Sequence, residues 1–205
     1  MELTAKTGKQ SVADGVQTPL RSVKNGSLLV ADGYPRYMQM ALDGELYIGA
    51  NLGGTPVTTQ AGLSATTPAL TLYNPVGSGV NLVLVTVCVD ITTAPAAAAG
   101  FMLAKNLVNA TAPATTTNAT MYNANLGSNK VPLGQCYRVA TLAVEPTAFR
   151  FIGGTTGAAA ISAVQLIDHV DGEVIISPGV AISIQATSAA ACLCSFTWLE
   201  VPLVS

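Results

Sequence analysis

Short apolar runs separated by turn-forming residues dominate the chain after about its first third. The clearest run covers residues 82–89, LVLVTVCV, and successive side chains of a strand point to opposite faces. The two resulting sets are Val83, Val85, Val87 and Val89 on one face and Leu82, Leu84, Thr86 and Cys88 on the other. Because neither set is truly polar, the pattern predicts a strand with one face in a core and the other covered by a second layer or another subunit.

Similar runs recur at the spacing expected of an antiparallel sandwich. Helical periodicity is weak throughout, and the alanine-rich run at residues 95–101 is interrupted by proline and glycine. The predicted strands cover residues 69–73, 80–91, 100–105, 117–122, 135–144, 148–152, 160–167, 174–176 continuing to 180–187, and 192–201. The predicted fold class is all-β, an antiparallel β-sandwich.

The first third of the chain has a different character. Residues 1–27 are polar without a sustained period, which is typical of an arm that is disordered or ordered only on a partner. Runs at 27–30, 37–42 and 45–48, joined by Asp-Gly turns, predict three short strands. We therefore predict an arm and small β docking unit at 1–50, a Gly/Thr/Ala-rich linker at 51–68, and a sandwich domain at 69–205.

Charge is scarce: only 10% of the residues are charged, against about 25% in typical soluble domains. No charged residue occurs at 46–89 or 174–199, which predicts a protein packed against neighbours in a homo-oligomer. The net charge of -2 argues against direct nucleic-acid binding. The N-terminus lacks the apolar stretch of a secretory signal, and no apolar run approaches the roughly 20 residues that cross a bilayer, so we expect a soluble protein made in the cytoplasm.

Candidate chemistry is sparse. The single histidine, His169, follows Asp168, but no G-x-S-x-G nucleophile motif is present. Oxygen ligands for a cation are offered by Asp168, Asp171 and Glu173, yet their spacing does not fit an EF-hand loop, and we interpret this segment as a solvated loop. A metal shared by three copies of His169 on a trimer axis is the alternative.

Cysteines and glycines add no site. Cys88, Cys136, Cys192 and Cys194 do not have zinc-site spacing and are interpreted as small buried apolar residues. The pairs Gly53-Gly54 and Gly153-Gly154 are not followed by a helix or a suitably placed lysine, so they predict no phosphate site. We predict no catalytic, cofactor-binding or metal-binding residues and do not expect an enzyme.

Four residues are predicted to lie in the core: Val83, Val85, Phe196 and Trp198, the last being the only tryptophan. If the domain boundaries are as predicted, a chain lacking residues 1–50 should retain a folded sandwich but no longer bind its partner.

Three blocks of the sequence resemble virion proteins of tailed bacteriophages. They are GELYIGANLGG at 44–54, LTLYNPVGSGVNLVLVTVCVDITTAPAAAAGF at 70–101 and ISPGVAISIQATSAAACLCSFTWLEV at 176–201. The resemblance is to jelly-roll proteins that decorate or cement the capsid, and to related head-fibre and tail-associated modules. It implies a jelly-roll sandwich, assembled in the host cytoplasm, that trimerises on the capsid surface, bridges major capsid subunits and uses its N-terminal segment as a clamp.

Other functions remain as alternatives. A tail-fibre or receptor-binding module would recognise a cell-surface glycan, with Tyr122 and Tyr137 as the best candidates near loops. A coat protein that forms a shell by itself would fit the length, but the N-terminal arm is not basic enough to neutralise a packaged genome. A hydrolase is the last alternative.

Overall fold

The computed structural model describes residues 36–51, 55–106, 111–157 and 164–203. The chain divides into two compact units, Met1–Gln39 and Met40–Ser205. Regular structure in the described residues is almost entirely β, apart from the five-residue helix α1 (Met38–Leu42). Within these residues no helix has the length and apolar character needed to span a bilayer.

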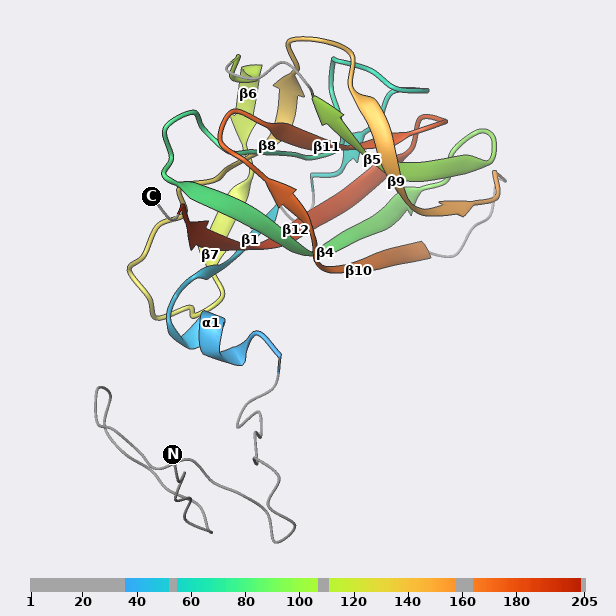
Figure 1. Cartoon of the computed structure of the whole chain (residues 1–205). Helices are drawn as coiled ribbons and strands as arrows, with labels where there is room; N and C mark the ends of the chain where they lie inside the picture. Colours follow the sequence, from blue (N-terminus) through green and yellow to red (C-terminus); the bar gives the residue numbers. More distant parts are fainter. Residues whose placement is uncertain (1–35, 52–54, 107–110, 158–163, 204–205) are drawn as a thin grey trace, which may run out of the picture. The chain divides into compact units, whose positions relative to one another are not determined.

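Two antiparallel sheets pack face to face, as Figure 1 shows. The first sheet has the order β10-β4-β12-β1-β7, with β2 also paired to β12, and the second has the order β6-β8-β3-β11-β5-β9. The strands are β1 (Leu46–Ala50), β2 (Val57–Thr58), β3 (Thr71–Tyr73), β4 (Val80–Thr93), β5 (Ala99–Asn106), β6 (Ala114–Asn118), β7 (Thr120–Asn123), β8 (Gln135–Thr141), β9 (Thr147–Thr155), β10 (Val164–Ile176), β11 (Ala181–Ala186) and β12 (Ala191–Pro202). The prediction of an all-β sandwich is confirmed.

The strand order is that of a jelly roll. Eight principal strands remain when β2 and the inserted strands β6, β7 and β8 are set aside. Counted in chain order, they run 6-3-8-1 in the first sheet and 2-7-4-5 in the second. Each sheet therefore interleaves strands from the two ends of the chain, as two Greek keys wrapped together require.

A β-bulge at Val85 changes which residues of β4 face the core. On β12, Thr197 pairs with Thr86 and the next residue, Trp198, pairs with Leu84, so Val85 has no partner in that register. The alternation shifts by one residue at this point. The buried set is Leu82, Leu84, Val85, Val87, Val89 and Ile91, and the opposite side carries Val83, Thr86, Cys88 and Asp90.

Of the four residues predicted to lie in the core, one is placed wrongly and three are confirmed. Val83 is only half-buried and lies on the outer side of its sheet. In contrast, Val85, Phe196 and Trp198 are all buried, as predicted. The outer side of β4 is also more polar than an unbroken alternation would make it, because threonine, cysteine and aspartate replace the valines there.

Strand β1 belongs to the sandwich. It lies between β12 and β7, and its Tyr47 ring stacks on Trp198 with the ring centroids 6.0 Å apart. A Cβ atom on Gly49 would come within 2.9 Å of the Cys136 Sγ atom, so the two sheets approach closely at this point. Removing residues 1–50 would remove this strand, and the expectation of a folded remainder is therefore withdrawn. The predicted linker likewise contributes β2 to the first sheet.

Three further strand predictions are wrong. The predicted continuous run 174–187 is divided between the end of β10 in the first sheet and β11 in the second. Residues 38–42 form α1, because Met, Gln, Ala and Leu favour helix, and Gly44 at φ +70° ends it. The predicted strand 117–122 is two strands, β6 and β7, which lie in different sheets and are separated at Ala119. The predicted strand at 27–30 lies outside the described residues.

Candidate interaction surface

The outward side of the first sheet, here called the open face, is poor in charged side chains. Its side chains alternate with the core residues of the same five strands. Across the strands they stand in register rows that run perpendicular to the chain direction. The residues of the open face are Leu46, Ile48, Ala50, Val83, Thr86, Cys88, Asp90, Thr120, Tyr122, Gln165, Ile167, His169, Ile175, Leu193, Ser195, Thr197 and Leu199.

One row of the open face is wholly apolar. Val83 pairs with Ile175 of β10 on one side and with Leu199 of β12 on the other, and Leu199 pairs with Leu46 of β1. Ile175 keeps 60% of its surface exposed, whereas Leu199 at the centre keeps 8%. Large apolar side chains directly opposite each other form a continuous ridge across four strands, and such a ridge gains free energy when a partner removes it from water.

The neighbouring rows are uncharged at their centre. The next row runs His169, Thr86, Thr197, Ile48 and Tyr122, and the one after it runs Ile167, Cys88, Ser195, Ala50 and Thr120. Asp90 is the one carboxylate in the register rows of this face, and it pairs with Leu193 near the end of β4. Five strands about 4.8 Å apart and three rows give an uncharged area of roughly 400 Å², about half of what one partner buries in a standard interface.

The predicted solvated loop at Asp168, Asp171 and Glu173 is part of a strand. β10 continues through it with a bulge at Asp171 and Gly172, both at positive φ. Asp168 is mostly buried and accepts hydrogen bonds from Arg150 of β9, at 2.6 Å from Nε and 3.0 Å from Nη2. Arg150 Nη1 also donates to Glu173 at 2.7 Å. The interpretation as a solvated loop is therefore wrong.

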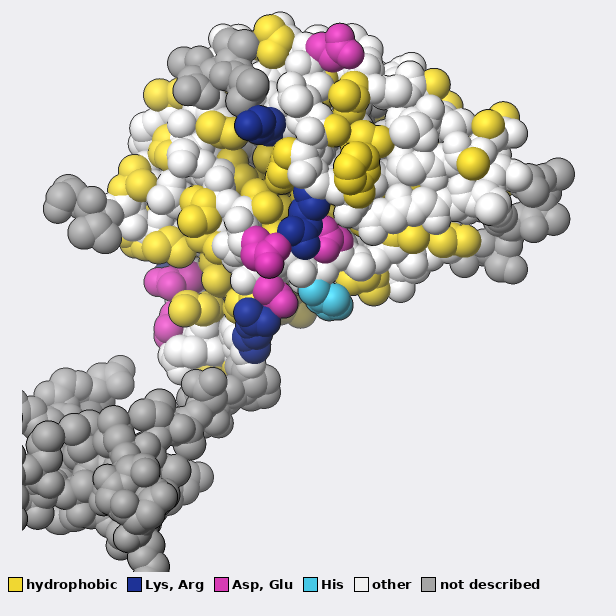
Figure 2. Space-filling view, turned by 45° about the vertical axis from the view of Figure 1, so that its right-hand side comes forward, with side chains coloured by type: hydrophobic (Ala, Val, Ile, Leu, Met, Phe, Trp, Pro, Cys, Tyr) yellow, Lys and Arg dark blue, Asp and Glu magenta, His cyan; other side chains and the backbone are white. Residues whose placement is uncertain are grey.

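Arg150 joins the edges of the two sheets, since β9 and β10 are edge strands of different sheets. The hydrogen bonds that Arg150 donates to Asp168 and Glu173 raise the pKa of Arg150 above its ordinary value, so the guanidinium remains charged. It neutralises Asp168 and Glu173, two of the three carboxylates that the sequence offered to a cation. Figure 2 shows acidic and basic side chains clustered beside the histidine, with other charged side chains scattered over the rest of this view.

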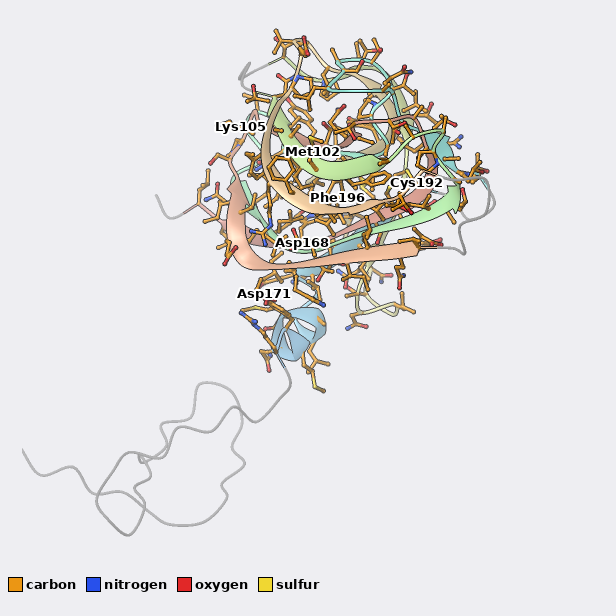
Figure 3. The ribbon with its side chains drawn as sticks, turned by 90° about the vertical axis from the view of Figure 1, so that its right-hand side faces the viewer. Met102, Lys105, Asp168, Asp171, Cys192 and Phe196 are labelled. Carbon is orange, nitrogen blue, oxygen red and sulfur yellow. The ribbon has the colours of Figure 1, made fainter. Side chains whose placement is uncertain are left out.

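This arrangement also protects the edge of β10, which Figure 3 shows with Asp168 and Asp171 labelled. Charged side chains and a bulge are the features with which native sheets discourage edge-to-edge pairing. His169 is exposed and pairs with Thr86 at the margin of the open face. The edge is thus less suited to association than the face beside it.

Three of the four cysteines are buried in the core: Cys136, Cys192 and Cys194. Burial raises the pKa of the Cys136 thiol, and the pKa of Cys194 is also raised by its neighbour Cys192, whose Sγ atom is 3.5 Å away. Buried thiols of this kind are chemically inert. Cys88 differs from the prediction, because it is half-buried and lies on the open face. Among the described residues no three metal-ligating side chains are grouped to hold a metal ion.

The two tyrosines proposed for a glycan site do not share a surface. Tyr137 is 9% exposed and packs in a small buried cluster with Tyr73 and Ala140 on the second sheet. Tyr122 lies on β7 of the first sheet with 60% of its surface exposed, and it lines a pocket formed with the following loop. Only Tyr122 therefore remains available to a ligand.

The glycine pairs give no cradle for a phosphate. Gly153 and Gly154 lie within β9, where Gly153 pairs with Phe101 and a Cβ atom on it would come within 3.2 Å of Leu166. They accommodate close packing in the sandwich. Gly53 and Gly54 lie outside the described residues.

A buried carboxylate in the last strand had no signal in the sequence pattern. Glu200 is 7% exposed and accepts hydrogen bonds from the backbone N–H groups of Leu133 and Gly134, at 2.9 and 2.8 Å. It fastens the segment before β8 to β12. The open face itself offers apolar burial and no charged pair, so its binding chemistry is hydrophobic. Comparisons of the chain with family models, with curated proteins and with solved structures give no match.

Proposed function

We propose that this chain is a non-enzymatic structural protein of a bacteriophage virion, which decorates and cements the capsid. In this proposal it forms a homo-oligomer, a trimer by the resemblance, on the capsid surface and bridges major capsid subunits. The observation that carries the proposal is the open face, with its apolar row Ile175, Val83, Leu199 and Leu46 and its uncharged centre. The assignment to a bacteriophage virion rests on the resemblance of the three sequence blocks.

The function needs burial of surface and no chemical step. The uncharged area of roughly 400 Å² contains one wholly apolar row, and the largest apolar patch of a typical monomer, about 300 to 600 Å², is often functional. The face supplies part of an interface, and neighbouring loops supply the rest. The residues before Arg36 are assigned, in the same proposal, the role of a clamp on the capsid.

The proposal is tested with a charge placed on the apolar row. The Val83→Lys variant should fold, because Val83 is half-buried at the surface, yet it should lose self-association, because lysine must leave water for the interface to form. The solution mass is measured by light scattering, and co-sedimentation with empty capsids is measured on the same samples.

Val76→Lys is the matched control. Val76 is 59% exposed in the connection between β3 and β4, so the same substitution there should change neither mass nor capsid binding. A monomeric wild-type protein that does not sediment with capsids would contradict the proposal. So would a Val83→Lys variant that assembles and sediments as the wild type does.

A further inference from the structure

We propose that the loop between β7 and β8 holds a binding site for one neutral sugar ring, in the pocket beside Tyr122. The loop follows β7 in Figure 1 and spans residues 124–134. This inference goes beyond the assembly function and does not depend on it, because the pocket uses no residue of the apolar row; of its lining residues used here only Tyr122 also belongs to the open face, at its β7 margin.

The pocket has the size of a single ring. Its volume is about 210 Å³, which is below the roughly 300 to 1,000 Å³ of pockets for drug-sized ligands. Its lining is mixed, with an aromatic ring, amide and hydroxyl groups and aliphatic side chains in one concavity. The residues used here are Tyr122, Asn125, Ser128, Asn129, Lys130 and Val131.

Hydrogen bonds to the two residues Asp43 and Gly44, which precede β1, connect the loop to the rest of the sandwich. Asn123 Nδ2 donates to the Gly44 carbonyl at 2.9 Å, and Asn123 Oδ1 accepts from the Asn125 backbone N–H at 2.9 Å. Lys130 Nζ donates to the Asp43 carbonyl at 2.5 Å. The polar lining is therefore mounted on a fixed backbone.

Glu200 holds the other end of the loop through its bonds to the N–H groups of Leu133 and Gly134. The same carboxylate accepts from Trp198 Nε1 at 3.3 Å, so the anchor is itself fixed in the core. A loop held at both ends loses little conformational freedom on binding a ligand, and this lowers the cost of association.

The chemistry of the lining fits a sugar. The exposed ring of Tyr122 offers a rigid apolar surface for the C–H face of a pyranose, while amides and hydroxyls bond its hydroxyl groups. Asn125 Oδ1 accepts from Gly127 N–H at 3.3 Å, and Asn125, Ser128 and Asn129 all line the pocket. This combination of tyrosine with asparagine and serine is the one that recognition loops use.

The lining has a single cation and no arginine pair, so it lacks the bidentate partner that an acidic group binds most strongly. Lys130 is the one charged residue that lines the pocket, and its ammonium group is already bound to the Asp43 carbonyl. Leu126 and Val131 are 84% and 78% exposed, and they form an apolar rim that a sugar can partly cover. An acidic sugar would find no arginine pair there to take up its carboxylate.

The test uses the full chain on an array of immobilised neutral and acidic oligosaccharides, with free monosaccharides as competitors. We expect retention on a subset of neutral glycans and loss of at least tenfold in signal for Tyr122→Ala. Tyr122→Phe keeps the ring and should retain most of the signal, and Asn129→Ala should reduce it. Phe151→Ala is the control. Phe151 is a 76% exposed aromatic residue on β9, the edge strand of the second sheet, whereas Tyr122 lies on β7 of the first sheet.

Three results of the glycan-binding test would count against the sugar site. No retention on neutral glycans, retention only on acidic ones, or an unchanged signal for Tyr122→Ala would overturn the inference, provided that the variant melts at the wild-type temperature. Asn129→Ala supplies the second test if Tyr122→Ala does not fold. Val83→Lys should lose assembly but keep glycan binding per chain, which separates failure of this site from failure of the assembly proposal.

Discussion

The outward sides of the two sheets differ in the accessibility of their side chains. On the second sheet the outward residues of β3, β11 and β5 are buried, including Thr71, Ser183 and Ala104 at 0 to 1% exposure. On the first sheet Ile175 and Ile167 remain 60% and 49% exposed. The two sides are similarly poor in charge, so composition alone does not separate them.

The difference comes from the path of the chain. β8 and β9 lie on opposite sides of β3, β11 and β5, so the connection at residues 142–146 crosses that side of the second sheet. Leu142 and Pro146 are buried, and Asn106 Nδ2 donates to the Val144 carbonyl at 3.0 Å. In the first sheet β4, β7 and β10 are each followed by a strand of the other sheet. One face is therefore covered by its own chain, and side chains of the other, such as Ile175 and Ile167, remain exposed.

The largest expected effect comes from placing the same charge on each face. Ser183→Lys puts an ammonium group under the covering segment, where Ser183 Oγ now accepts from Gln185, and we expect a loss of about 4 kcal/mol or more in the free energy of unfolding. Val83→Lys on the open face should cost less than about 1 kcal/mol. Urea denaturation of both variants measures the difference. Equal costs would show that the two faces are not distinct.

A second experiment examines the contact between the sheets under the open face. Gly49→Val should destabilise by about 3 kcal/mol, because its side chain would meet Cys136 and Trp198 in a core that has no room. Ala50→Val, one residue on and facing outward in β1, should change stability by less than about 0.5 kcal/mol. A Gly49→Val variant as stable as the control would contradict the close approach of the sheets here.

The ion pair at the edge gives a smaller effect. Arg150→Met should cost about 2 kcal/mol, because it leaves the mostly buried Asp168 carboxylate without its cation. Glu173→Gln should lower the free energy of unfolding by at most about 0.5 kcal/mol, since Glu173 is 69% exposed. The raised pKa of Arg150 means that its stabilisation is present below its ordinary pKa and is lost only as pH rises through the raised value. The arginine therefore stays charged from about pH 6 to pH 9. The loss in the free energy of unfolding caused by Arg150→Met should be the same across this range.

The smallest change is chemical labelling, which does not perturb the fold. In native protein Cys88 should react with iodoacetamide before the other three thiols, because it lies half-buried on the open face while they are in the core. Assembly should slow the labelling of Cys88 and leave the core thiols unchanged. Mass spectrometry of the labelled peptides measures both rates, and faster labelling of Cys192 or Cys194 would count against the described packing.

The strands and the fold class followed from the sequence because alternation reports burial directly. The period-two pattern of β12 placed Phe196 and Trp198 in the core correctly. The assignment of Val83 failed because a bulge at Val85 is set by pairing with β12 and β10, which no local pattern records. Residues 38–42 were misassigned because a short apolar run does not distinguish a helix from a strand.

The candidate surfaces were only partly predictable for a related reason. The lack of charge indicated that some face would be covered, but the order of the strands decides which one. The pairing of Asp168 and Glu173 with Arg150 joins residues far apart in the sequence, and the anchoring of the Tyr122 loop by Glu200 does so too. Contacts of this kind depend on topology, and a single sequence does not contain them in readable form.

The most direct measurement is the solution mass of the wild-type protein beside that of Val83→Lys, taken by light scattering over a range of concentrations. The proposed role of the open face requires a stable oligomer, three times the mass of one chain, for the wild type and a folded monomer for the variant. A wild-type protein that stays monomeric at all concentrations, or a Val83→Lys variant with the same oligomeric mass, would contradict it.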